Sequence, residues 1–247
     1  LFQPEKINTY EIGWKNVLPG GRLRTNIAGF YSKYKDVQVP GSIGVDTDDD
    51  GVADTFAGVT TNAAKATLWG VELEGDARLL EDAFAGGDSL TWTFSMGYIK
   101  AEYDEYLGRG SPPPDLSGDA VFQNTPKWTG YNRLTYSTPM NLIGAGATSL
   151  YASAAYKSLT HQFNYVGALD QPGYALLDAG LFWKSDSGRW TVGVYGTNLT
   201  DKRYVVAGYD FVSSLPGFAN APLGLTGVLT TFYGDPRQVF GTVAVSF

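Results

Sequence analysis

One segment places acidic residues at a spacing that suits a metal ion. The stretch VDTDDDGVAD matches the alternating ligand positions of a calcium-binding loop, with Gly51 where such loops turn sharply. The candidate Ca²⁺ ligands are Asp46, Asp48, Asp50, the Val52 carbonyl and Asp54. Ala57 stands where an EF-hand has its bidentate glutamate, and no flanking helices are evident, so the pattern is closer to the loops of extracellular calcium modules. The alternative is a solvated acidic loop without a metal.

Aromatic side chains in the segments between the expected strands are the second candidate group. Such rings stack on sugar rings or on other flat, apolar ligands. The candidate substrate-binding residues are Tyr103, Tyr106, His161, Phe163, Tyr165, Tyr209, Phe211, Phe218, Phe232 and Tyr233. The alternative for rings at strand ends is an interfacial girdle, which we favour for Trp69, Trp128 and Trp183. Phe218 and Phe232 leave both interpretations open, and His161 could also be an ordinary surface residue.

Other chemistry is largely excluded by composition. The chain has no cysteine and one histidine, which excludes thiolate nucleophiles and cysteine-ligated metals. A hydrolase built on His161 with Ser153 or Ser158 lacks a recognisable orienting acid, so we expect no enzyme. A net charge of −7 and a pI near 4.7 argue against a nucleic-acid partner.

The elements that must position these residues are strands, because apolar residues recur with period two. Between positions 90 and 98, for example, the even positions are apolar or aromatic and the odd ones are small or polar. Nine strands fit, and no comparable helical stripe competes. Their expected ranges are 6–17, 22–36, 63–80, 89–104, 126–138, 148–162, 174–185, 189–203 and 236–247.

Strand length and loop length indicate a membrane barrel. Several strands reach the ~9–11 residues that a tilted membrane-crossing strand needs, whereas soluble strands average ~5–6. Short and long connections alternate along the whole chain, as in antiparallel barrels with short periplasmic turns and longer outside loops. The apolar set should then face lipid, and Glu72, Glu74, Asp76 and Arg78 should face the lumen. No apolar run is long enough for a transmembrane helix.

Several motifs resemble those of TonB-dependent outer-membrane receptors. The opening PEKINTYEIGWKN and GRLRTNIAGFYSKYKDVQ resemble that family's strand–turn–strand unit, and NAAKATLWGVELEGDARL resembles its "N-A … G-V-E-L-E" strand. NTPKW, TVGVYGTNLTDKRY and the terminal YGDPRQVFGTVAVSF resemble three further elements in the family's order.

The resemblance implies that residues 1–247 are the C-terminal part of a 22-stranded β-barrel whose plug and N-terminal strands lie elsewhere. It implies uptake of a ferric siderophore, cobalamin or an oligosaccharide across the bacterial outer membrane, driven by TonB. The expected partners are the lipid bilayer, the plug domain, the remaining barrel strands, TonB and a small-molecule ligand. The alternative is a structural or adhesive outer-membrane barrel without active transport. Nine strands leave two free edges, so we expect this chain to be one part of a barrel.

Overall fold

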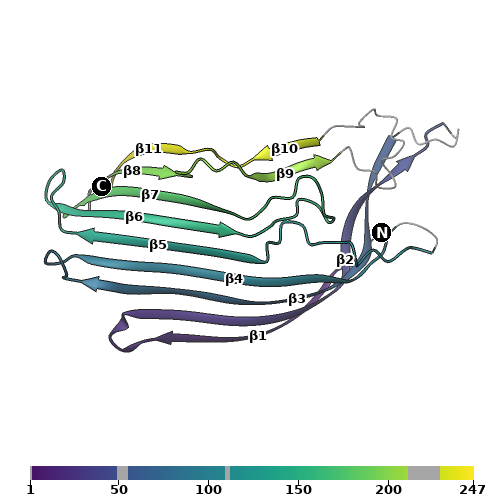
Figure 1. Cartoon of the computed structure of the whole chain (residues 1–247), viewed down its shortest axis with the longest axis horizontal. Coiled ribbons are helices and arrows are strands. Elements are labelled where there is room, and N and C mark those ends of the chain that lie inside the picture. Colours follow the sequence, from purple (N-terminus) through teal and green to yellow (C-terminus); the bar gives the residue numbers. More distant parts are fainter. Residues whose placement is uncertain (1, 49–54, 109–111, 211–228) are drawn as a thin grey trace.

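The chain folds into one long antiparallel sheet and one short one. The computed structural model describes residues 2–48, 55–108, 112–210 and 229–247. The long sheet has nine strands in the order β1-β2-β3-β4-β5-β6-β7-β8-β11, and β9 pairs with β10 (Figure 1). The strands are β1 (Lys6–Val17), β2 (Leu23–Val45), β3 (Thr55–Glu81), β4 (Ser89–Tyr106), β5 (Trp128–Thr138), β6 (Gly146–Lys157), β7 (Tyr174–Ser185), β8 (Trp190–Thr197), β9 (Val205–Asp210), β10 (Leu229–Tyr233) and β11 (Gln238–Val245). The all-β prediction and the nine-stranded antiparallel sheet are confirmed.

The connections between strands are of two kinds, and the two kinds lie at opposite ends of the sheet. Short turns join β1 to β2, β3 to β4, β5 to β6 and β7 to β8, at the end that also carries the C-terminus (Figure 1). We call this the turn end, and the opposite end, near the N-terminus, the loop end. The first turn contains a short 3-10 helix, η1 (Pro19–Gly21), in which Gly20 takes a φ of 82° that suits a residue without Cβ. The expected separation of turns from loops is confirmed.

Cross-strand pairing places every second side chain on the same face of the sheet. Leu73 of β3 pairs with Met96 of β4, so this cross-strand row is apolar. Glu74 pairs with Asn26 of β2 and with Ser95 of β4, so the adjacent row is polar. Because side chains alternate along a strand, the two rows lie on opposite faces. We call these the apolar face and the polar face.

The described part of the chain places no second layer over the apolar face. Ile12 is 82% exposed, Trp14 is 70% exposed and Met96 is 49% exposed on this face. A sheet with one apolar side normally buries it against another layer, yet the long sheet is a single layer (Figure 1). This arrangement suits a sheet whose apolar face meets hydrocarbon. Within the described ranges, no helix is long and apolar enough to cross a membrane.

Aromatic rings gather on the apolar face toward the loop end. The Tyr98 ring centroid lies 5.3 Å from that of Trp69 and 4.6 Å from that of Trp128. Trp69 and Trp128 are both exposed, as an interfacial position requires. Trp183 departs from that expectation, because it is only 6% exposed and its Nε1 donates to the Gly144 carbonyl at 3.2 Å. It packs beneath the turn between β5 and β6 instead.

The buried apolar core lies at the loop end. It consists of Val37 on β2, Ala64 on β3 and Tyr106 on β4, with four half-buried residues packed around them. Those four are Tyr34, Val39, Tyr103 and Ala120. The core therefore joins the outer parts of three strands to the segment that follows β4.

Several expected strand boundaries were wrong. The predicted loop 37–61 is largely the continuation of β2 and β3, which pair up to Val45 and Thr55 and rise beyond the rest of the sheet (Figure 1). The strand expected to reach residue 162 ends at Lys157. The strand expected to reach residue 203 ends at Thr197, where Asn198 takes a left-handed φ of 47°. The predicted last loop contains the separate hairpin of β9 and β10.

Candidate functional site

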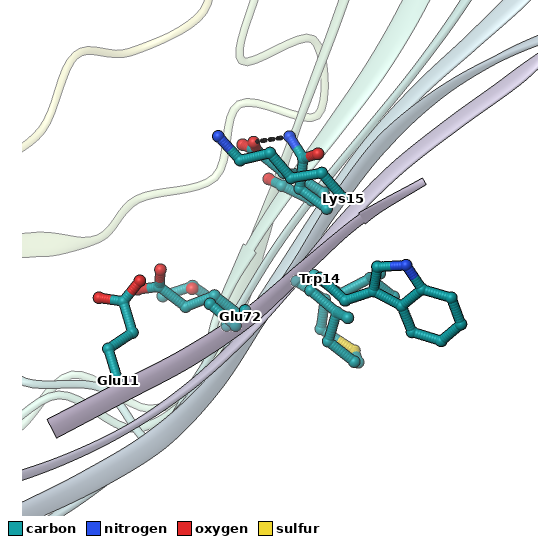
Figure 2. A pocket seen from close by; sticks show the side chains of 14 residues that line it. Glu11, Trp14, Lys15 and Glu72 are labelled. Atoms are coloured by element: carbon teal, nitrogen blue, oxygen red, sulfur yellow. Dashed lines mark hydrogen bonds between the residues drawn. The ribbon is translucent and has the colours of Figure 1, made fainter. Parts of the chain in front are cut away.

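The polar face is hollowed beside the edge strand β1 (Figure 2). Glu11 and Lys15 from β1 and Glu72 from β3 project from the same side of the sheet, whereas Trp14 points to the other side. The hollow has a volume of about 550 Å³. Glu11, Lys15 and Glu72 line its polar-face side, so charged or polar groups can bind there.

Small residues flank the carboxylate of Glu72. Gly13 and Ala28 lie in its cross-strand row on one side, and Gly97 lies on the other. Their short side chains leave the carboxylate uncovered. None of the ion pairs formed among the described residues includes Glu72. A cationic group from outside the described residues could therefore bind there.

The neighbouring charges on the polar face are partly satisfied within the sheet. Asn26 Nδ2 donates to Glu74 Oε1 at 2.8 Å, the bond drawn in Figure 2. Arg24 Nε lies 3.9 Å from Asp76 Oδ1. The expected sharing of one face by the β3 charges follows from their register. Among the described residues, no cluster of three or more His, Cys, Asp or Glu side chains could hold a metal ion.

At the loop end, two of the predicted ligand-contacting tyrosines are packed against the protein itself. Tyr103 stacks on Phe122 with centroids 4.3 Å apart and meets the Tyr106 ring edge-on at 4.9 Å. Tyr106 is 8% exposed, and its hydroxyl accepts a hydrogen bond from Asn164 Nδ2. These rings therefore fasten the segments that follow β4 and β6 to each other.

His161 lies in the segment that follows β6, and it has an acidic partner that the sequence did not reveal. Its Nδ1 is 2.8 Å from Asp170 Oδ2, and both side chains are largely buried. The missing orienting acid is thus present. However, the Ser158 hydroxyl accepts a hydrogen bond from the Trp128 backbone N–H, and no hydrogen bond among the described residues joins it to His161. The neighbouring Phe163 and Tyr165, both predicted ligand contacts, stack on each other with centroids 5.2 Å apart.

The hairpin of β9 and β10 presents the most accessible of the predicted rings. Tyr209 is 57% exposed and meets Phe232, 48% exposed, edge-on with centroids 6.0 Å apart. Tyr233 is also exposed, and the Arg203 guanidinium lies 3.9 Å from its ring centroid. Phe211 and Phe218 lie outside the described residues. The structure thus brings Tyr209 and Phe232 together, and it leaves both of these rings and that of Tyr233 uncovered.

The predicted calcium loop is only partly within the described residues. Asp46 and Asp48 are described, and the Asp48 backbone N–H donates to Asp46 Oδ1 at 3.2 Å. Asp50, Val52 and Asp54 lie outside the described residues. The calcium site therefore stays a prediction.

Two motifs named above, NAAKATLWGVELEGDARL and TVGVYGTNLTDKRY, each contain an Asn whose hydrogen bonds the sequence did not reveal. In the first, Asn62 exchanges hydrogen bonds with the backbone of Gln3, and Glu5 accepts from the Gln38 backbone N–H at 2.6 Å. In the second, the Asn198 side chain bonds the backbone of Lys202 and the Asp235 carbonyl. An Asn that is buried, or that lies where a strand ends, is the signal for such a side-chain clamp, meaning an Asn that hydrogen-bonds the backbone of another segment. Both clamps hold chain segments at the loop end.

Comparison with known proteins agrees with this architecture. The profile of the family described as TonB dependent receptor-like, beta-barrel matches residues 1–199. The pesticin receptor of Yersinia pestis is 30% identical over 215 residues, which cover 84% of this chain and 26% of that protein.

Solved structures share the fold over the whole chain. The ferric yersiniabactin uptake receptor FyuA from Yersinia pestis has a TM-score of 0.67 at 23% identity, covering 100% of this chain and 30% of that one. The ferric-catecholate import receptor Fiu from E. coli K12 has a TM-score of 0.61 at 19% identity, covering 100% of this chain and 28% of that one. The chain spans less than a third of these relatives' lengths. It belongs to the TonB-dependent receptor family.

Proposed function

We propose that this chain supplies barrel wall and extracellular loops to an outer-membrane receptor that takes up a ferric siderophore with energy from TonB. The family consists of receptors and transporters rather than enzymes. Relatives described as receptors for ferric yersiniabactin, ferric catecholate and ferric preacinetobactin favour an iron complex over cobalamin or an oligosaccharide. The observation that carries the proposal is the single-layer sheet with one exposed apolar face and one charged face.

The polar face is our proposed contact with a plug domain in the lumen. Glu72 and Glu74 project from the middle of β3, and Glu72 is uncovered and unpaired among the described residues. A charged group is expensive to leave unpaired once water is excluded, so a protein-filled lumen should supply a partner. The apolar face is correspondingly our proposed contact with lipid.

The exposed rings at the loop end are our proposed ligand contacts. Tyr209, Phe232 and Tyr233 present apolar surface on the side where the long connections gather. Rings in this position can stack on the planar or apolar parts of a siderophore while its charged iron centre stays hydrated. His161, held by Asp170, is less accessible and makes a weaker candidate.

Uptake of iron-loaded siderophore by cells tests the proposed function. A strain lacking the full-length gene should lose uptake of one ⁵⁵Fe-labelled siderophore and should regain it when the intact gene is restored. Removal of TonB should abolish that uptake while leaving ligand binding at the cell surface intact. Uptake that persists without TonB would contradict the proposal.

Paired substitutions test the ligand surface. Tyr209→Ala with Phe232→Ala should weaken siderophore binding by roughly tenfold, the usual scale for losing aromatic anchors. Phe84→Ala is the matched control, because Phe84 is an exposed aromatic residue (77%) in the turn between β3 and β4 at the opposite end. Equal effects of the two changes would remove the ligand assignment.

A structural or adhesive barrel without transport is the second candidate. Its sheet would need the same apolar face, so the fold does not discriminate between the two. Membrane insertion together with normal growth under iron limitation in the deletion strain would favour this candidate.

The calcium loop is a separate proposal that concerns the loop end. Ca²⁺ binding there would be weak, in the range of extracellular modules at roughly 10⁻⁴–10⁻³ M. Calorimetry on the purified receptor should show calcium-dependent heat that Asp48→Ala removes. Absence of that heat in the unsubstituted receptor would refute the site.

A further inference from the structure

A second, aromatic group of side chains lies on the same polar face, on strands β5, β6, β8 and β11. The Arg133 guanidinium on β5 lies 3.8 Å from the ring centroid of Tyr151 on β6. The ring centroid of Tyr151 lies 6.4 Å from that of Tyr195 on β8. The Tyr195 ring stacks on that of Phe240 of β11, with centroids 5.5 Å apart. Register places all four on the polar face. Tyr151 and Tyr195 both pair with Gly180 of β7, Phe240 pairs with Tyr195, and Arg133 pairs with Thr93 of β4. We call these four residues the aromatic strip.

The rings of the aromatic strip lie flat because glycines beneath them leave room. A Cβ added at Gly180 would come within 2.4 Å of Tyr151 Cε1 and within 2.9 Å of Tyr195 Cδ1. A Cβ at Gly193 would come within 2.9 Å of the Tyr195 ring. The tyrosines therefore occupy the space of the absent side chains, and Tyr151 forms a fixed platform under the guanidinium.

Arg133 is held in place but has no counter-charge among the described residues. Its Nε donates to Thr135 Oγ1 at 3.3 Å, which fixes the plane of the guanidinium together with the Tyr151 ring. No carboxylate among the described residues lies within 4.0 Å of it. Asp178 lies in the same cross-strand row but accepts from the Asn198 backbone N–H at 2.8 Å. The forked Nη donors of Arg133 thus remain available.

The position of Arg133 makes this unpaired charge costly in a filled barrel. It is the central residue of β5, with Trp128 at the loop end and Thr138 at the turn end of that strand. A guanidinium at this height loses most of its hydration when protein fills the lumen. Stacking on a ring keeps the fork oriented without satisfying its donors, and a carboxylate satisfies two of them at once.

We infer that Arg133 is a docking point for an Asp or Glu carboxylate of the polypeptide that fills the barrel lumen. The inference rests on the proposed function, which supplies that polypeptide as the plug. A plug carboxylate would receive two parallel N–H···O bonds from the oriented fork. Apolar plug atoms next to that carboxylate would pack on Tyr195 and Phe240. This part of the polar face thus selects a charge opposite in sign to the one that the Glu72 hollow would bind.

Hydrogen exchange of the complete receptor in nanodiscs tests the inference. Arg133→Gln should speed exchange in one plug segment by roughly tenfold or more, because a bond to a charged group is lost. Arg133→Cys should do the same, and this part of the chain contains no other cysteine. Treating the cysteine with 2-aminoethyl methanethiosulfonate restores a cation and should slow exchange again. Methyl methanethiosulfonate adds no charge and should leave exchange fast.

Three results would overturn the inference, and they differ from failure of the proposed function. If hydrogen exchange of the plug is unchanged in Arg133→Gln, and the barrel still shows its normal heat-dependent shift in gel migration, Arg133 has no docking role. Unchanged plug exchange with weakened binding of the anionic ferric siderophore reassigns Arg133 to the ligand path. Equal slowing by the charged and uncharged reagents shows that bulk, not charge, matters. A full-length protein without any lumen-filling segment would instead defeat the proposed function.

Discussion

Met96 and Ser95 are neighbours on β4 whose side chains lie on opposite faces of the sheet, so the same substitution at both tests the facing assignment. Lys100 pairs with Glu102 at 2.9 Å and marks the polar border toward the loop end. At ~3.3 Å per residue and a tilt of ~45°, Met96 lies about 9 Å below that border. This places it near the middle of an apolar band about 25 Å tall.

Arginine at these two positions should have very different costs. Met96→Arg puts a cation into hydrocarbon near mid-depth, which costs about 2–4 kcal/mol, or roughly 30- to 900-fold in the folding equilibrium. Ser95→Arg puts the same cation on the polar face, opposite Glu74 in the register, where an exposed pair gains about 0–1 kcal/mol. The full-length protein should therefore tolerate the second change.

Refolding into lipid vesicles with urea titration measures this difference directly. The Met96→Arg protein should show a lower free energy of unfolding by at least about 2 kcal/mol relative to Ser95→Arg, with an unchanged urea slope. In cells, its heat-modifiable folded band should be depleted. Equal stability of the two variants, or greater loss in Ser95→Arg, would refute the facing assignment.

The other predictions concern single residues outside that comparison. Burial alone would raise the pKa of Asp88, but the Tyr136 hydroxyl and backbone N–H groups of the turn outweigh this and hold its pKa below the usual value. The ionised form therefore stabilises the turn above the unfolded pKa of ~3.9, and this stabilisation is lost as pH falls through the lower folded pKa. Asp88→Asn should therefore lower the urea midpoint at pH 7, and the difference from the unsubstituted protein should shrink as the pH falls below ~3.9. Asn198→Ala removes bonds to two backbone segments and should cost about 2–3 kcal/mol, seen as faster hydrogen exchange at 198–204 and 234–237. Gly180→Ala should lower the thermal unfolding temperature through a cost of about 1–3 kcal/mol, whereas Gly118→Ala, with open space around it, should leave it unchanged.

The strands and their facing could be predicted from the sequence because both depend on local alternation. Leu73 and Glu74 differ in polarity, and a strand must send neighbours to opposite faces, so the register between β3 and β4 follows once the strands pair. The outer parts of β2 and β3 were missed because Pro40, Gly41 and Gly58 are typical of turns. Pairing between two distant segments overrides that local preference, as the ladder up to Val45 demonstrates.

The site was harder to predict, because its geometry depends on contacts between remote segments. The acidic partner of His161 is nine residues away across a loop, and nothing in the local sequence singles out Asp170. Tyr106 accepts a hydrogen bond from Asn164, fifty-eight residues later. The Arg133–Tyr151 stack likewise needs the β5–β6 register before the two residues can be seen as neighbours.

The central claim is that alternate side chains of this sheet contact lipid. Single cysteines at each position from 90 to 98 on β4, labelled with a fluorophore in the complete receptor in vesicles, test it most directly, since this part of the chain has no native cysteine. Doxyl-labelled lipid should quench the even positions, including Phe94 and Met96, and should spare Thr93 and Ser95. Quenching without a period of two, or stronger at the odd positions, would contradict the account.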